Sequence, residues 1–152
     1  MIMNIIDLIN KVVTVLTTDE TLKAWASAHL AGQTYRVFVG VDDMNPPTPD
    51  QYPLLAVTEL RTTGESQKGR TSHEIDLAAG VNDDTMVTDD DAGSVVQQGL
   101  LLAEQFREQA RDALLRSHFG KISISGETGQ VSVFPLFVSG MTLTIETINT
   151  NI

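Results

Sequence analysis

Apolar residues recur at helical spacing in three parts of this chain. The first part is amphipathic and predicts a helix over Ile5–Leu16. The polar segment 17–20 interrupts it and supplies an N-cap for a second helix, Thr21–Leu30. The longest helix is predicted from Ala92 to about Arg116. Its apolar stripe comprises Val95, Gly99, Leu102, Phe106, Ala110, Ala113 and Leu114.

The other regular segments are short, β-rich and bounded by turn residues, as strands are. Strict alternation of apolar and polar residues predicts a strand over Met141–Ile148. Runs of strands separated by one long helix indicate an α+β fold, in which the N-terminal helix and the long helix flank an antiparallel or mixed β-sheet. One domain, 1–152, is expected at this length. The remaining predicted strands are Tyr35–Val41, Tyr52–Leu60, Thr71–Val81, Lys121–Ser125 and Gln130–Phe134, the last two flanking a turn at 126–129.

A long β-hairpin loop is predicted between Tyr52–Leu60 and Thr71–Val81. The ten residues 61–70 are polar and include three cations, Arg61, Lys68 and Arg70. Hairpin loops usually have two to five residues, so a loop of this length is unlikely to serve stability and is typical of a binding segment. We therefore expect these three cations to contact a partner or a neighbouring subunit.

Two irregular segments are acidic. Asp42–Asp50 contains three prolines and is predicted to be a stiff, extended connection. Asn82–Asp91 is predicted to be an acidic linker. Its last residues, Asp89–Asp91, precede the predicted long helix, where the helix dipole favours negative charge.

The charge of the chain argues against nucleic-acid binding. It has ten Lys and Arg against twenty Asp and Glu, for a formal net charge of -10. Proteins bind phosphate backbones through Lys and Arg, and no segment here forms a basic stripe. No apolar run approaches the roughly 18 residues that a membrane-spanning helix needs, so no membrane association is expected.

No residue pattern indicates an enzyme, a metal site or a cofactor. The chain has no cysteine, which excludes disulfides and thiolate ligands. His29, His73 and His118 lie in three different predicted elements and in no metal-binding motif. The acidic linker lacks the glycine that a calcium loop needs at position six, where Thr88 or Ser94 would fall. The phosphate-binding glycine loops and the nucleophile elbow are also missing from the sequence.

Three segments, in this order and combined with the long helix, carry a resemblance. They are the aromatic-Pro-apolar run Tyr52–Val57, the alternating run His73–Leu77, and the final alternating run Met141–Glu146. Together they resemble the bacteriophage tail terminator family, also described as minor tail protein U-like. The resemblance covers most of the chain and implies a single tail-terminator-like domain.

The resemblance implies a structural virion protein. Members form a ring of six copies that caps the tail tube, stops its polymerisation and presents a surface to the head connector. The implied partners are further copies of the chain, the tail tube protein and the head–tail connector or neck protein. The implied location is the head-proximal end of the tail, after assembly in the bacterial cytoplasm. DNA would pass through without specific binding, and we expect Asp42, Asp43, Asp83 and Asp84 to face that passage.

Other functions remain open from the sequence. A head-completion or neck protein of the same joint would show similar features. A small-ligand or regulatory binding domain could use the proline-rich segment Asp42–Asp50 as a lid. A hydrolase based on His73 with Glu74 or Asp76 is the remotest alternative, because adjacent strand residues point to opposite faces of a sheet.

Overall fold

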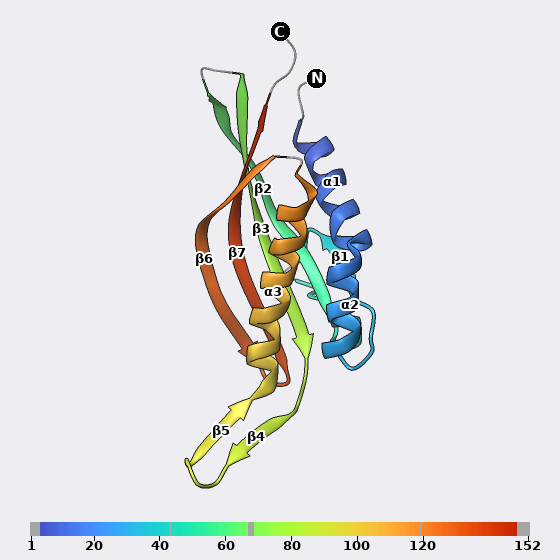
Figure 1. Cartoon of the computed structure of the whole chain (residues 1–152), viewed down its shortest axis with the longest axis vertical. Helices are drawn as coiled ribbons and strands as arrows, with labels where there is room; N and C mark the ends of the chain where they lie inside the picture. The colour runs from blue at the N-terminus through green and yellow to red at the C-terminus, as the bar shows by residue number, and fades with distance from the viewer. Residues whose placement is uncertain (1–3, 43, 67–68, 119, 149–152) are drawn as a thin grey trace.

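A computed structural model describes the chain except residues 1–3, 43, 67–68, 119 and 149–152 (Figure 1). Three helices, α1 (Ile5–Thr18), α2 (Glu20–His29) and α3 (Gln98–Ser117), lie against a sheet in this described part. The predicted α+β class is confirmed, and both N-terminal helices are within two residues of their predicted ends. The strands are β1 (Arg36–Val39), β2 (Leu54–Ser66), β3 (Arg70–Asn82), β4 (Met86–Asp89), β5 (Ser94–Gln97), β6 (Lys121–Val133) and β7 (Leu136–Ile148).

Five of these strands form one mixed sheet in the order β1-β2-β3-β7-β6. β1 runs parallel to β2, and every other neighbouring pair in this sheet is antiparallel. β4 and β5 form a separate two-stranded hairpin. In Figure 1 this hairpin projects from one end of the molecule, and the β2–β3 hairpin projects from the opposite end. The short 3₁₀ helix Pro49–Gln51 lies between β1 and β2.

The core lies between the helices and one face of the sheet. Phe106 on α3 is fully buried, and its ring lies 5.7 Å from that of Trp25 and 5.5 Å from that of Tyr35, between centroids. In β3 every second side chain from Thr71 to Val81 is buried, as expected for a strand with one covered face. The α3 stripe packs on β3 and β7 in one hydrophobic core that also includes residues of β2. Its buried members are Leu102, Phe106, Ala110 and Leu114 on α3, and Leu55, Val57, Ile75, Leu77, Met141, Leu143 and Ile145 on the strands.

Asp19 joins α1, α2 and α3. Its backbone N–H closes the end of α1 by donating to Val15, and its carboxylate accepts from the N–H of Leu22 at 2.8 Å as the N-cap of α2. Arg116 at the end of α3 donates to the same carboxylate at 2.7 Å. The hydrogen bond from Arg116 holds the pKa of Asp19 below its usual value. One residue, through its backbone and its side chain, thus joins three helix ends.

The prediction of a ten-residue loop at 61–70 is wrong. β2 continues to Ser66 and pairs with β3 up to Ser66↔Arg70, so only 67–69 lie between the strands. β7 pairs with β3 over the same length, up to Arg70↔Ile148. Backbone pairing on both sides of β3 supports this polar segment, which lacks the apolar alternation that sequence patterns detect.

The predicted helix start at Ala92 is also wrong. Residues 94–97 form β5, and α3 begins only at Gln98. Asp89 accepts hydrogen bonds from the N–H groups of Asp91 and Ala92, both at 3.1 Å, and Gly93 has φ +69°. Those acidic residues therefore stabilise a hairpin turn, which glycine completes in the left-handed region, and do not precede a helix. The predicted acidic linker likewise contains β4.

The turn predicted at 126–129 is absent from the described structure. β6 is continuous from Lys121 to Val133, with two register shifts against β7, at Ile124/Gly126 and Glu127/Gly129. The chain reverses instead at Phe134 and Pro135, between Val133 and its partner Leu136. The glycines that suggested a turn are accommodated as bulges, which is a common position for glycine in a strand.

Replacing Phe106 with alanine should lower the free energy of unfolding by about 3–5 kcal/mol, because a buried aromatic side chain is lost and a cavity remains. Denaturant unfolding of the purified protein measures this. Leu101→Ala, at a half-exposed position of the same helix, is the matched control and should change stability by no more than about 0.5 kcal/mol. An unchanged midpoint for Phe106→Ala would contradict the packing described above.

Replacing Asp19 with alanine should cost about 0.5–2 kcal/mol at pH 7, the usual value of a lost N-cap. Because the pKa of Asp19 is lowered on folding, its stabilisation is present above the unfolded pKa near 4 and is lost as pH falls through the lower folded pKa. Urea unfolding at pH 7 and pH 3 should therefore show a smaller difference at pH 3. Asp19→Asn keeps a capping oxygen without the charge, so its stability difference from the wild type should also narrow at pH 3. A stability difference between the wild type and the Asp19 variants that does not change with pH would contradict this role.

Candidate assembly surfaces

The two described cations of the predicted loop, Arg61 and Arg70, do not form one cluster. Arg61 lies within β2, where its guanidinium contacts Glu59, Glu74 at 3.0 Å and Asp76 at 3.6 Å. The hydrogen bond to Glu74 raises the pKa of Arg61. Arg70 begins β3 and is exposed, about 13 Å along the strand from the residue paired with Arg61. Lys68 lies outside the described residues, and the interface role of the three cations stays a prediction.

The carboxylates around Arg61 occupy the face of the sheet opposite the helices. Glu74 and Asp76 alternate along β3 with the buried residues His73, Ile75 and Leu77, so they point away from the core. Asp76 also accepts a hydrogen bond of 2.6 Å from Thr142 on β7. This open face therefore carries a polar, mostly acidic region with one central arginine.

Of the aspartates predicted to face a DNA passage, Asp42 lies apart from Asp83 and Asp84 in the described structure. Asp42 follows β1, and its carboxylate accepts from Met44 N–H and from the Asn45 side chain, which lowers the pKa of Asp42. Asp83 and Asp84 follow β3, and Asp83 accepts from Thr85 N–H at 2.8 Å. β1 and β3 are separated by β2, so one chain does not gather these carboxylates into one site. Asp43 lies outside the described residues, and the lumen assignment stays a prediction.

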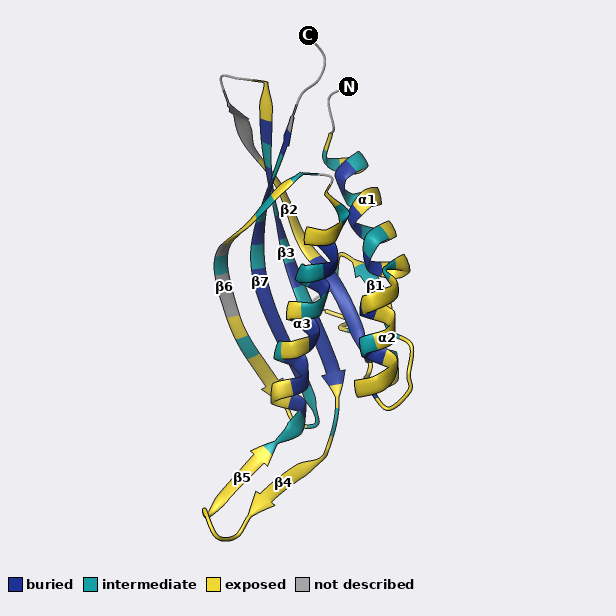
Figure 2. Cartoon of the chain, viewed as in Figure 1, coloured by how far each residue is buried: buried dark blue, intermediate teal, exposed yellow. Residues whose placement is uncertain are grey.

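The β4–β5 hairpin projects from the body of the molecule and exposes apolar side chains. Its four apolar side chains, Met86, Val87, Val95 and Val96, are each between 38% and 64% exposed. Figure 2 shows the hairpin exposed along both strands. The sequence pattern had carried a detectable signal for it, since Met-Val-Thr and Ser-Val-Val flank a turn that contains Gly93. The prediction of a linker and a long helix obscured that signal.

Further apolar side chains are exposed near this hairpin. Leu100 and Leu101 lie on the first turns of α3, which directly follows β5. Val131 and Val133 at the end of β6 are 68% and 74% exposed. The side chain of Gln130 donates to the carbonyl of Leu100 at 2.6 Å, so the end of β6 lies beside the start of α3. Exposed apolar residues grouped in this way are typical of a protein–protein contact surface.

This end of the molecule is also acidic. The segment 82–97, which contains β4 and β5, has no Lys or Arg but five Asp. Asp89, Asp90 and Asp91 form the tip of the hairpin. A contact here therefore combines apolar strands with a negatively charged tip.

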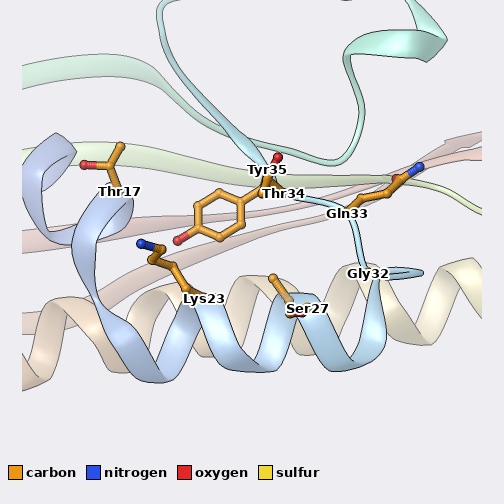
Figure 3. A pocket seen from close by; sticks show the side chains of 8 residues that line it. Thr17, Lys23, Ser27, Gly32, Gln33, Thr34 and Tyr35 are labelled. Carbon is orange, nitrogen blue, oxygen red and sulfur yellow. The ribbon is translucent and has the colours of Figure 1, made fainter.

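A pocket of about 380 Å³ lies between the two N-terminal helices and the chain that leads to β1 (Figure 3). Its polar lining includes Thr17, Lys23, Ser27 and Tyr35. The Tyr35 hydroxyl donates to the carbonyl of Leu16, and burial raises the pKa of Tyr35 to about 12, with a further contribution from Asp19. None of the lining residues comes from Asp42–Asp50, so the pocket gives no support to a proline-rich lid.

In the described part of the chain, no group of three His, Asp or Glu could hold a metal ion. His73 is buried on the helix side of β3 beside Thr62, whereas Glu74 points to the opposite face, as expected from strand geometry. No helix among the described residues is long and apolar enough to cross a membrane.

In comparisons with known proteins, no protein-family model and no curated protein matches this chain. Its function is therefore inferred from its own residues and their arrangement.

Replacing Arg61 with glutamate would place four carboxylates together on the open face of the sheet. We expect a lower melting temperature at low ionic strength and a partial recovery at high salt, because salt screens repulsion between exposed charges. Thermal unfolding at two salt concentrations measures both effects. Arg70→Glu is the matched control on the same hairpin and should change the melting temperature little. Equal melting curves for the two variants would show that the Arg61 ion pairs contribute nothing.

Proposed function

We propose that this protein is a structural subunit of a phage tail, which forms a ring at the head-proximal end of the tail tube and ends tube polymerisation. The observation that carries the proposal is the β4–β5 hairpin, whose four apolar side chains are 38% to 64% exposed in the described structure. Exposed apolar strands of this kind are a liability in a monomer and are expected in an assembly protein.

The shape of the subunit supports a role between two partners. One end carries the long β2–β3 hairpin, supported by β7, and the other end carries the β4–β5 hairpin (Figure 1). A capping ring has to contact the tube on one side and the head connector on the other. Two projecting hairpins at opposite ends provide separate surfaces for these two contacts.

The segments that resemble tail terminators are neighbours in the sheet. Tyr52–Val57 leads into β2, His73–Leu77 lies in β3 and Met141–Glu146 lies in β7, and these three strands are adjacent. The resemblance thus concerns the centre of the fold and not scattered surface loops. A head-completion or neck protein of the same joint would use the same surfaces and is the nearest alternative.

A small-ligand binding protein is the second candidate, and the pocket beside Tyr35 is the observation that favours it. Such a protein is expected to be a monomer or a small oligomer whose stability rises with ligand. The two functions therefore predict different masses in solution.

Native mass spectrometry and sedimentation should show a ring of six copies, visible by negative stain. Six copies at -10 each carry a formal charge of about -60, so repulsion opposes closure. We expect the ring to strengthen as salt rises to 0.1 M, where charges more than about 10 Å apart are largely screened. A short DNA duplex should not bind at any salt concentration, because no basic surface releases its counterions.

Two outcomes would contradict the proposal. A protein that stays monomeric at every salt and protein concentration would argue against a self-assembling ring and favour the ligand-binding alternative. Tight duplex binding that weakens steeply with salt would argue against a passage through which DNA moves freely.

A further inference from the structure

The β4–β5 hairpin exposes apolar side chains on both of its faces. Val87 and Val96 are paired across the strands and point to one face of the ribbon, whereas Met86 and Val95 point to the other. An isolated two-stranded hairpin is only marginally stable in water. Docking one face on a flat surface would leave the backbone groups at the edges of the hairpin unpaired. Joining the edge of a sheet would pair the backbone of one hairpin strand and place its apolar side chains beside those of the acceptor strand.

An edge of this kind is present on every copy of the chain. β6 is the outermost strand of the sheet, next to β7 only. Beyond its two register shifts, the segment Gly129–Val133 pairs with β7 in unbroken register over five residues. Each strand of the β4–β5 hairpin has four residues, so the segment is long enough to receive one of them.

The segment 129–133 lacks the features that normally protect an edge strand. Such features are lysine, proline and bulges, and this segment has no charged residue and no proline. Val131 and Val133 point to the same open face of the sheet as their β7 partners Val138 and Leu136, and both valines are largely exposed. An added strand bearing valine would extend this aliphatic row.

The opposite edge of the sheet is a poorer acceptor. β1 has only four residues, Arg36–Val39. The side chain of Arg36 is held by the carbonyl of Asp50 at 3.0 Å, which brings the segment before β2 close to this edge. The open segment of β6 is therefore the better site for strand addition.

We infer that the β4–β5 hairpin of one copy adds to the β6 segment Gly129–Val133 of the next copy. The inference rests on the proposed ring and names the contact that closes it. Donor and acceptor are different surfaces of the same chain, so the contact is head-to-tail and repeats around a ring. The acidic tip Asp89–Asp91 approaches another acidic subunit, which makes this contact sensitive to salt.

Cross-linking between two singly substituted proteins tests the contact directly. The chain has no cysteine, so Val96→Cys and Val131→Cys each introduce the only thiol. A mixture of the two variants, treated with a short bismaleimide, should give a covalent dimer on a denaturing gel. A mixture of Val96→Cys with Lys121→Cys is the control and should give none, because Lys121 lies about 33 Å along β6 from Val131. Dimers of Val96→Cys alone would show that hairpins pair with each other and would overturn the inference.

Blocking the edge gives an independent test that leaves the hairpin intact. Val131→Lys places a protecting lysine on the acceptor segment and should abolish the oligomer in native mass spectrometry. Ser123→Lys, exposed on the same face of β6 but before the register shifts, should retain it. Circular dichroism should show both variants folded. An oligomer that persists in Val131→Lys, with no Val96–Val131 cross-link, overturns this inference and leaves the ring standing. A wild-type protein that is monomeric at every salt and protein concentration overturns both this inference and the proposed ring.

Discussion

The structure depends on the pairing of β3 with β7 over its whole length and with β2 from Arg70 to Gly80. The helix α3 packs on β3 and β7. These interactions join segments that are up to 78 residues apart, as in Arg70↔Ile148. The strands stay hydrogen-bonded to one another beyond the helices. The polar β2–β3 hairpin can therefore extend past the hydrophobic core.

In the described structure, the helices cover one face of this sheet and leave the other face open. This difference determines which side chains of the sheet are buried and which are exposed. On the covered face, Phe106 and the aliphatic residues of β3 and β7 exclude water. On the open face, the carboxylates around Arg61 occupy one region, and the exposed valines of β6 occupy another. A two-layer protein with one open face and one open edge leaves both available for contacts with other molecules.

The β4–β5 hairpin combines exposed apolar side chains with an acidic tip. The exposed valines and Met86 do not stabilise the isolated chain. The edges of the two strands also have backbone groups that can pair with other proteins. The acidic tip and the net charge of -10 oppose unspecific association through repulsion. Apolar strands that associate and charges that repel together favour a contact with one defined geometry, in which the strands pair and the acidic tips stay in solvent.

The sequence by itself determined the fold class, the two N-terminal helices and the residues of the α3 stripe from Gly99 to Leu114, because each depends on local apolar periodicity. It did not determine the length of β2, the continuity of β6 or the hairpin at Met86–Gln97. The lengths of β2 and β6 depend on backbone pairing with β3 and β7, which leaves no periodic trace in polar segments. The hairpin at Met86–Gln97 has apolar residues that are evident in the sequence, but the predicted linker and long helix obscured them. Only the tertiary structure shows that these side chains stay largely exposed.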